Sequence, residues 1–202
     1  LTLIIGCQNT QQKGDHLLIV TTIYPYELIL NSLVTEDTNV ISIIPPNASP
    51  HTYSPKPEDV KLLEEADLVV SNGAELEVYL DNILAPLSEK HIQAFDLIQE
   101  ILADEEDCHD CQGECHNNRI NPHFWLDPLL VISIANGITE YLMEIDPDNI
   151  DNYEKNLNQS LLEILTLNDT ILTERERLGN INVLHFHDSF YYFNKRYDIY
   201  SA

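Results

Sequence analysis

Histidines in loops and after strands are the side chains of this sequence best suited to chemistry. His51 and His123 lie beside prolines, and His187 follows an apolar segment that we expect to be a strand. In open α/β sheets ligands bind beyond the carboxyl ends of the strands, so three imidazoles from separate loops could converge there. Neutral imidazole suits zinc, copper, iron and nickel better than calcium or magnesium. The pattern therefore favours a transition-metal site.

The other histidines give weaker or competing signals. His185 lies two residues before His187, on the same face of the expected strand, and the residues alone barely separate the two. His16 and His91 have no supporting context. A single histidine beside an aromatic residue is more often structural than a ligand, so the expectation rests on the combination of positions.

A second group of potential ligands lies in one acidic segment, residues 104–118. Within nine residues it holds Cys108, His109, Cys111, Cys115 and His116. No aliphatic residue occurs in it, which is typical of a surface loop. We interpret it as a low-affinity loop that collects metal. A disulfide-linked loop with one spare thiol and a closed structural zinc site are the alternatives.

The first sixteen residues indicate export. The opening Leu1-Thr2-Leu3-Ile4-Ile5-Gly6-Cys7 is apolar and ends in a small residue before a cysteine, and polar residues follow. This resembles the end of a bacterial lipoprotein signal, with Cys7 as the lipidated residue and the following residues as a tether. A fragment of an ordinary signal peptide and a chance buried strand are the alternatives.

Charge limits the possible partners. The sequence has 34 acidic and 10 basic residues and a formal net charge of −24. Such a surface attracts cations and repels nucleic acid and anionic lipid, so we expect no nucleic-acid partner. No segment reaches the roughly 20 consecutive apolar residues of a membrane helix.

Alternating strands and helices predict an α/β fold with a parallel sheet. We expect strands at 17–22, 40–44, 68–71 and 93–96, and helices at 27–33, 57–66, 75–84 and 128–145. A further helix from 147 to about 177 would span roughly 46 Å, which is too long for one lobe. Gly179 ends it, and a strand at 181–186 and a helix at 188–197 should follow.

The predicted organisation is two parallel-sheet α/β lobes joined by one long helix. Residues 1–16 are a signal remnant and tether, 17–146 the N-terminal lobe, 147–178 the linker helix and 179–202 the start of the C-terminal lobe. Only one strand and one helix of the second unit are present, so we expect this lobe to be truncated here.

Three motifs resemble the metal-ligand motifs of the zinc and manganese solute-binding proteins of ABC transporters. They are Pro50-His51-Thr52-Tyr53-Ser54-Pro55-Lys56-Pro57-Glu58-Asp59-Val60, Pro122-His123-Phe124-Trp125-Leu126-Asp127-Pro128, and His187-Asp188-Ser189-Phe190-Tyr191-Tyr192-Phe193 with Arg196-Tyr197. The match runs in order from residue 17 to residue 202, so it covers almost the whole sequence.

The resemblance implies a binding protein rather than an enzyme. His51 and His123 would be ligands from the first lobe and His187 from the second, which leaves His185 out. Manganese receptors usually have a carboxylate at the position of His187, so zinc is favoured over manganese as the transported ion. The fourth ligand of the family, an acid near the C-terminus or a water, matches no residue here. We interpret Glu58 as a helix-capping acid and Asp127 as a partner behind the ligands.

The resemblance also implies partners and a location. The partners are the permease and the ATPase of a metal importer. The location is the periplasm, or the outer face of the cytoplasmic membrane through a lipid anchor. A zinc hydrolase is one rival, because three histidines and a water also hold a catalytic zinc, but no His-Glu-x-x-His motif or general base is evident. A role in cell adhesion, a label often given to this family, would need a partner surface that the sequence does not reveal.

Overall fold

The structure is a computed structural model that describes residues 16–105 and 120–201. The expected lipidation site Cys7 lies outside these residues. The same holds for the expected metal-collecting residues Cys108, His109, Cys111, Cys115 and His116. Both expectations stay predictions.

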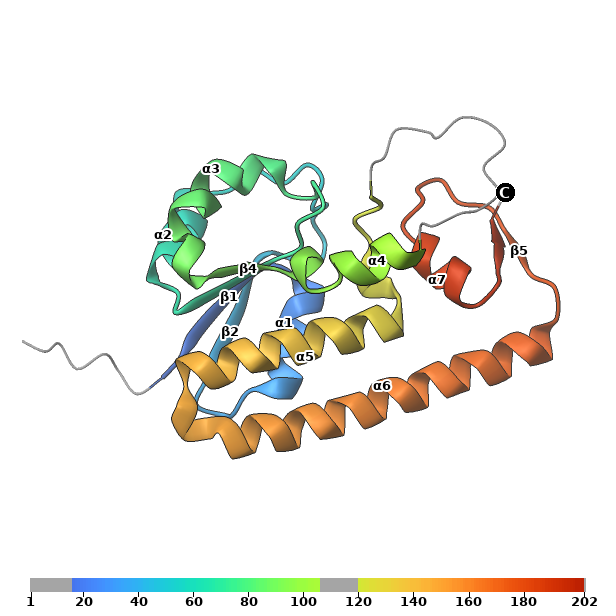
Figure 1. Ribbon diagram of the computed structural model, residues 1–202. Helices are drawn as coiled ribbons and strands as arrows, with labels where there is room; N and C mark the ends of the chain where they lie inside the picture. Colours follow the sequence, from blue (N-terminus) through green and yellow to red (C-terminus); the bar gives the residue numbers. More distant parts are fainter. Residues whose placement is uncertain (1–15, 106–119, 202) are drawn as a thin grey trace, which may run out of the picture.

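A four-stranded parallel sheet is the centre of the fold (Figure 1). Its strand order is β2-β1-β3-β4, with bounds Asn39–Ile44, Leu18–Ile23, Leu68–Ser71 and His91–Gln93. Val20 of β1 lies in register with Ile41 of β2 and Val69 of β3. The two central strands are buried along almost their whole length, which explains their continuous apolar sequence.

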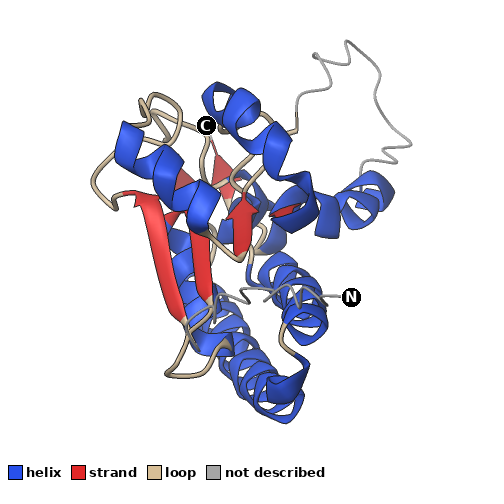
Figure 2. Ribbon diagram, turned by 90° about the vertical axis from the view of Figure 1, so that its left-hand side faces the viewer, coloured by secondary structure: helices blue, strands red, loops and turns tan. Residues whose placement is uncertain are grey.

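Helices cover both faces of this sheet. The chain moves outward from β1 to β2 and then returns past β1 to β3. Right-handed crossovers therefore place α1 (Tyr24–Leu33) and α2 (Pro57–Glu65) on opposite faces. Figure 2 shows the strands between the two helical layers. This parallel α/β architecture confirms the predicted fold class.

Helix α5 (Pro128–Ile145) packs against α1 and α6. Asp127 caps its first turn, because its side chain accepts a hydrogen bond from the Leu129 N–H, and Pro128 occupies the first position. Within the described residues it is the one helix long and apolar enough to cross a membrane. Its buried face lies in the core of the protein, as a core helix requires.

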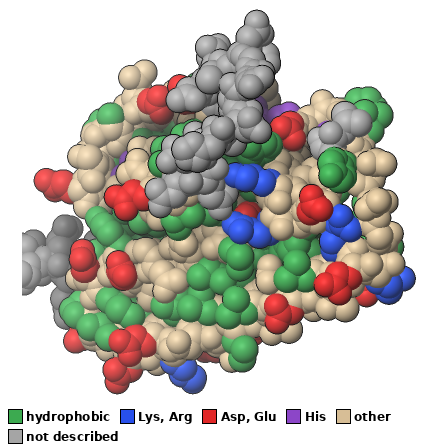
Figure 3. Space-filling view, turned by 45° about the vertical axis from the view of Figure 1, so that its right-hand side comes forward, with side chains coloured by type: hydrophobic (Ala, Val, Ile, Leu, Met, Phe, Trp, Pro, Cys, Tyr) green, Lys and Arg blue, Asp and Glu red, His purple; other side chains and the backbone are tan. Residues whose placement is uncertain are grey.

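Helix α6 (Ile150–Leu178) runs past the sheet to the C-terminal elements (Figure 1). Its first half is fixed to α1: Asn156 Nδ2 donates to the carbonyls of Leu33 and Val34, and Ser160 Oγ lies 3.0 Å from Ser32 Oγ. The part of the helix after Ser160 exposes leucines, among them Leu162, Leu165, Leu167 and Leu172. In Figure 3 apolar side chains, with acidic ones among them, cover much of the lower part of the molecule.

The C-terminal elements are short. They are β5 (Asn182–Val183), α7 (Tyr191–Arg196) and β6 (Tyr200–Ser201), and the two strands pair in parallel. Arg175 of α6 fixes them to the helix, since its guanidinium donates to the carbonyls of Tyr197 and Asp198. The domain boundaries expected from the sequence stay a prediction.

Several elements differ from the expectation. The helix expected at 75–84 is instead a 3-10 turn, Val78–Leu80, followed by α3 (Asp81–Leu84) and a second 3-10 segment, Ala85–Lys90. The reason is a left-handed turn in front of it, with φ of 77° at Gly73, 49° at Ala74 and 59° at Glu75.

Three other boundaries were also wrong. The strand expected at 93–96 ends at Gln93, and a 3-10 turn, Ala94–Leu97, follows it. The strand expected at 181–186 is only β5, because Leu184 and Phe186 are exposed and pair with no neighbouring strand within the described chain. The start of the expected loop, residues 104–105, belongs to helix α4 (Gln99–Glu105).

Candidate metal centre

Three imidazoles from three separate segments meet at one point. His51 lies in the loop after β2, His123 precedes the 3-10 turn Phe124–Leu126, and His187 follows β5. The Nε2 atom of His123 is 3.2 Å from that of His51 and 3.1 Å from that of His187. Within residues 16–105 and 120–201 this is the one group of three or more His, Cys, Asp or Glu that could hold a metal ion.

The spacing of these nitrogens suits a tetrahedral ion. Zinc–nitrogen bonds of about 2.0–2.1 Å in tetrahedral geometry place two nitrogen ligands about 3.3–3.4 Å apart. The two measured separations are within a few tenths of an ångström of this value. The ligand atoms of the third pair, His51 and His187, lie within 4.8 Å of each other, so all three imidazoles can reach one ion by side-chain movement.

The backbone around His123 is held by buried polar groups. The His123 side chain is only 5% exposed, and both its backbone N–H and its Nδ1 lie within hydrogen-bond distance of Asn121 Oδ1. Asn72, at the end of β3, donates from Nδ2 to the Pro122 carbonyl. The sheet thereby fixes the segment that carries His123.

Other contacts hold the loop of His51. The Tyr79 hydroxyl donates to the Pro50 carbonyl at 2.7 Å. The Tyr53 hydroxyl donates to Asp59, and that carboxylate also accepts from the Lys56 N–H at the start of α2. The helix-capping acid is therefore Asp59. Glu58, which the sequence suggested for this role, lies exposed in the first turn.

His51 and His187 are both exposed, and only His123 is buried. The His187 ring meets those of His51 and His123 edge to face, at centroid distances of 5.2 and 4.8 Å. The competing residue His185 points elsewhere: its Nε2 lies 2.8 Å from Asn194 Nδ2, and its ring stacks on Phe190. The geometry thus brings His187 rather than His185 to the cluster.

Asp127 connects the motif of His123 to the motif of His187. Among the interactions that the structure describes, none joins Asp127 to an imidazole of the cluster. The Asp127 carboxylate, 3% exposed, lies 2.9 Å from Arg196 Nε on α7. The pair joins the start of α5 to the helix that follows His187. Asp127 is therefore a partner of Arg196, and no contact supports the role behind a ligand that the sequence suggested.

The match to known proteins covers the elements described above. The family model described as "Zinc-uptake complex component A periplasmic", ZnuA, matches residues 19–202. The chain belongs to the ZnuA family. The resemblance to metal-binding solute-binding proteins is thereby confirmed.

Several ZnuA-family relatives are similar over most of this chain. A "Putative metal-binding protein" of Thermotoga maritima is 34% identical over 186 residues, which are 90% of this chain and 61% of that protein. The "High-affinity zinc uptake system protein ZnuA" of Bacillus subtilis is 27% identical over 98% of this chain and 65% of its own length. This chain therefore spans less than two thirds of these two relatives.

Solved structures and further relatives extend the comparison. A crystal structure of a ZnuA deletion mutant with zinc bound has a TM-score of 0.78 and 30% identity, covering 93% of this chain and 69% of that chain. A manganese transporter lipoprotein of Streptococcus gordonii is 31% identical over 86% of this chain and 55% of that protein. The family thus includes proteins named for zinc and for manganese.

The surroundings lower the pKa of two rings of the cluster. Desolvation, and then the neighbouring His187 and His51, lower the pKa of His123 to about 4. Desolvation and His187 also lower the pKa of His51. Neutral imidazole is the form that binds a metal, so these two ligands are ready to bind at neutral pH.

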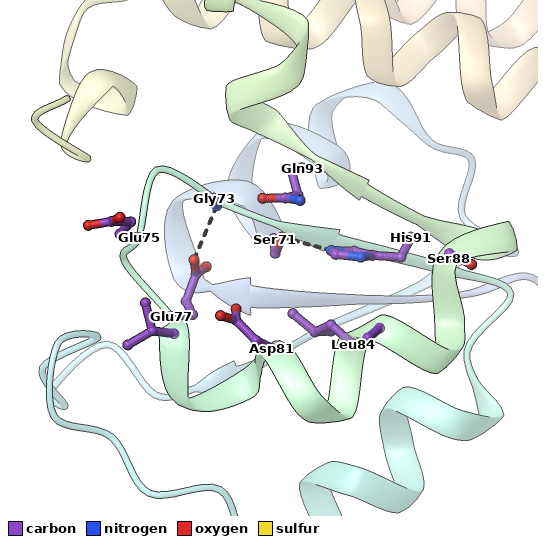
Figure 4. A pocket seen from close by; sticks show the side chains of 11 residues that line it. Ser71, Gly73, Glu75, Glu77, Asp81, Leu84, Ser88, His91 and Gln93 are labelled. Carbon is purple, nitrogen blue, oxygen red and sulfur yellow. Dashed lines mark hydrogen bonds between the residues drawn. The ribbon is translucent and has the colours of Figure 1, made fainter. Parts of the chain in front are cut away.

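Two further histidines of the described residues, His91 and His16, lie apart from the cluster. His91 Nε2 is 2.8 Å from Ser71 Oγ, in a cavity of about 480 Å³ between the sheet edge and α3 (Figure 4). Burial lowers the pKa of His91. His16 Nδ1 lies 3.0 Å from the Asp37 carbonyl. Both therefore have structural contacts of their own.

Acid should destabilise the metal-free protein partly through His123. Its pKa is about 4 in the folded protein against an ordinary value of 6.5, so the unfolded chain binds the proton first. The contribution of His123 to the free energy of unfolding is full above pH 6.5 and is lost as the pH falls from 6.5 to about 4. We expect His123→Gln to flatten this part of the curve of unfolding free energy against pH, measured by urea titration. A curve parallel to that of the wild type would contradict this, and His16→Gln is the control.

Proposed function

We propose that this chain is part of an extracytoplasmic receptor that captures zinc and delivers it to an ABC-type membrane permease. The observation that carries the proposal is the convergence of His51, His123 and His187: their ligand atoms all lie within 4.8 Å of one another, and both separations from His123 are close to those of tetrahedral zinc ligands. Zinc is the cargo here, so the site has to bind the ion and also release it.

The roles of the three ligands differ. His123 is buried and fixed by the sheet, so it is the anchoring ligand. His51 lies on a loop fixed by Tyr79. His187 comes from the C-terminal elements, whereas the other two precede α5, so it is the ligand that closes the site. Membership of a transport family and the absence of a general base among the described cluster residues favour binding over catalysis.

The choice of metal follows from the ligand chemistry. Sites with nitrogen ligands bind manganese far more weakly than zinc, and carboxylate ligands suit manganese better than imidazoles do. We expect the wild type to bind zinc more tightly than manganese, and His187→Glu to reduce that preference. Competition titration with both ions measures it. Tighter binding of manganese by the wild type would refute the assignment.

Transport itself needs a separate test. The receptor should stimulate ATP hydrolysis by its cognate permease and ATPase in liposomes when zinc is bound. Turnover of ester, peptide or phosphate substrates by the zinc-loaded protein, without any effect on the transporter, would favour a hydrolase instead.

Lipidation at Cys7 and metal collection by residues 104–118 remain part of the proposal. Mass spectrometry of the mature protein tests the first, and deletion of the segment tests the second.

A further inference from the structure

The Asn121 side chain contacts the backbone on both sides of the histidine cluster. Its Oδ1 lies 3.0 Å from the His123 backbone nitrogen and 2.7 Å from His123 Nδ1. Its Nδ2 donates to the Asp188 carbonyl at 2.7 Å. One amide group therefore touches the anchoring ligand and the residue next to His187.

The two backbone contacts fix the orientation of this amide. A backbone N–H can only donate and a backbone carbonyl can only accept. The Asn121 oxygen must therefore face His123, and its NH₂ group must face Asp188. Because Asn121 Oδ1 is an acceptor, His123 Nδ1 has to carry the hydrogen, and His123 Nε2 keeps its lone pair. That lone pair points at the other two histidines.

The position of Asn121 is itself fixed from the sheet. The neighbouring Pro122 carbonyl accepts from Asn72, which is fully buried. The Asn72 oxygen in turn accepts from the Tyr26 hydroxyl at 2.6 Å. The amide of Asn121 is thus supported by rigid elements, which is what a group that orients a ligand needs.

We propose that Asn121 is a positioning residue that couples the anchoring ligand to the closing ligand. It holds His123 with hydrogen on Nδ1, and it ties that ring to the backbone of residues 187–188. The inference rests on the proposed zinc function. If residues 187–188 move away, the Asn121 amide loses one of its contacts. Because this amide orients His123, the site then loosens as a unit.

The test compares Asn121→Ala with Asn156→Ala. Asn156 is a matched control because its side-chain amide also bonds to the backbone at two residues, Leu33 and Val34, far from the cluster. We expect Asn121→Ala to weaken zinc binding by about 10- to 100-fold and Asn156→Ala to leave it within about threefold. Zinc affinity from chelator competition is one readout. The tautomer of His123 in the metal-free protein, from long-range ¹H–¹⁵N NMR, is the other.

Asn121→Asp separates the two contacts. A carboxylate still accepts from His123 Nδ1 but cannot donate to the Asp188 carbonyl. We expect it to keep the Nδ1–H tautomer, which Asn121→Ala loses. Both variants should speed hydrogen exchange at the Ser189 amide, which bonds to the His187 carbonyl.

Three outcomes are distinguishable. A wild type that does not bind zinc would overturn the proposed function, whatever the tautomer. If the wild type binds zinc and Asn121→Ala binds it equally tightly with the same His123 tautomer, the positioning role alone is overturned. Exchange at Ser189 as slow as in the wild type in both Asn121 variants would overturn the coupling to residues 187–188.

Discussion

Replacing His123 with alanine should lower zinc affinity by at least two orders of magnitude. Structural zinc sites with four ligands bind with roughly 10–16 kcal/mol, which is about 2.5–4 kcal/mol for each ligand. Each 1.4 kcal/mol corresponds to about tenfold in affinity, so one lost ligand costs about 10²- to 10³-fold. His123 should show the largest effect because its Nε2 lies within 3.2 Å of both other ligand atoms.

Chelator competition at constant pH measures this loss. His51→Ala and His187→Ala should also bind zinc much more weakly. His91→Ala, His16→Ala and His185→Ala are the controls, since these rings have other contacts. Wild-type affinity in His123→Ala would show that the site lies elsewhere.

Replacing Glu77 with alanine should destabilise the protein by about 2–4 kcal/mol. The buried carboxylate accepts from the Thr22 hydroxyl and from the backbone N–H groups of Asn72 and Gly73. Without it three buried donors lose their acceptor, which costs about 1–3 kcal/mol for each unsatisfied group. Burial raises the pKa of Glu77, so removing a costly buried charge offsets part of the loss.

A graded series makes this prediction sharper. Glu77→Gln keeps one acceptor oxygen for Thr22 and Asn72 and leaves only the Gly73 N–H without a partner, so we expect a smaller loss. Glu144→Ala on the exposed side of α5 should change stability by less than about 0.5 kcal/mol. Urea unfolding monitored by circular dichroism measures all three. Equal stability of Glu77→Ala and the wild type would mean that water replaces the carboxylate.

The sequence predicted those elements whose signals are local. Helix α5 has the predicted bounds because Asp127 and Pro128 form its start and an apolar segment continues to Ile145. Strand β3 also matches, because both of its faces are buried. The helix predicted after Gly73 was wrong because the spacing of apolar residues does not reveal the positive φ angles at Ala74 and Glu75.

The site was predictable only in part for the same reason. His51, His123 and His187 stand in motifs that can be read along the chain, and the structure brings them together. The groups that position them come from distant segments: Asn72 reaches Pro122 across 50 residues, and Asn121 reaches Asp188 across 67. Asn121 directly precedes the Pro122-His123 motif, which was the one signal that could have indicated its role.

Helix α6 acts as a lever arm because it is fixed at one end. Its side-chain bonds to α1 end at Ser160, and 18 further residues lead to Leu178, a length of about 27 Å. Over that length a bend of roughly 5° displaces the far end by about 2 Å. Metal–ligand distances tolerate only about 0.2 Å. The stiffness of a largely solvent-exposed helix therefore contributes to how firmly His187 is held, together with the Asn121–Asp188 and Asp127–Arg196 contacts.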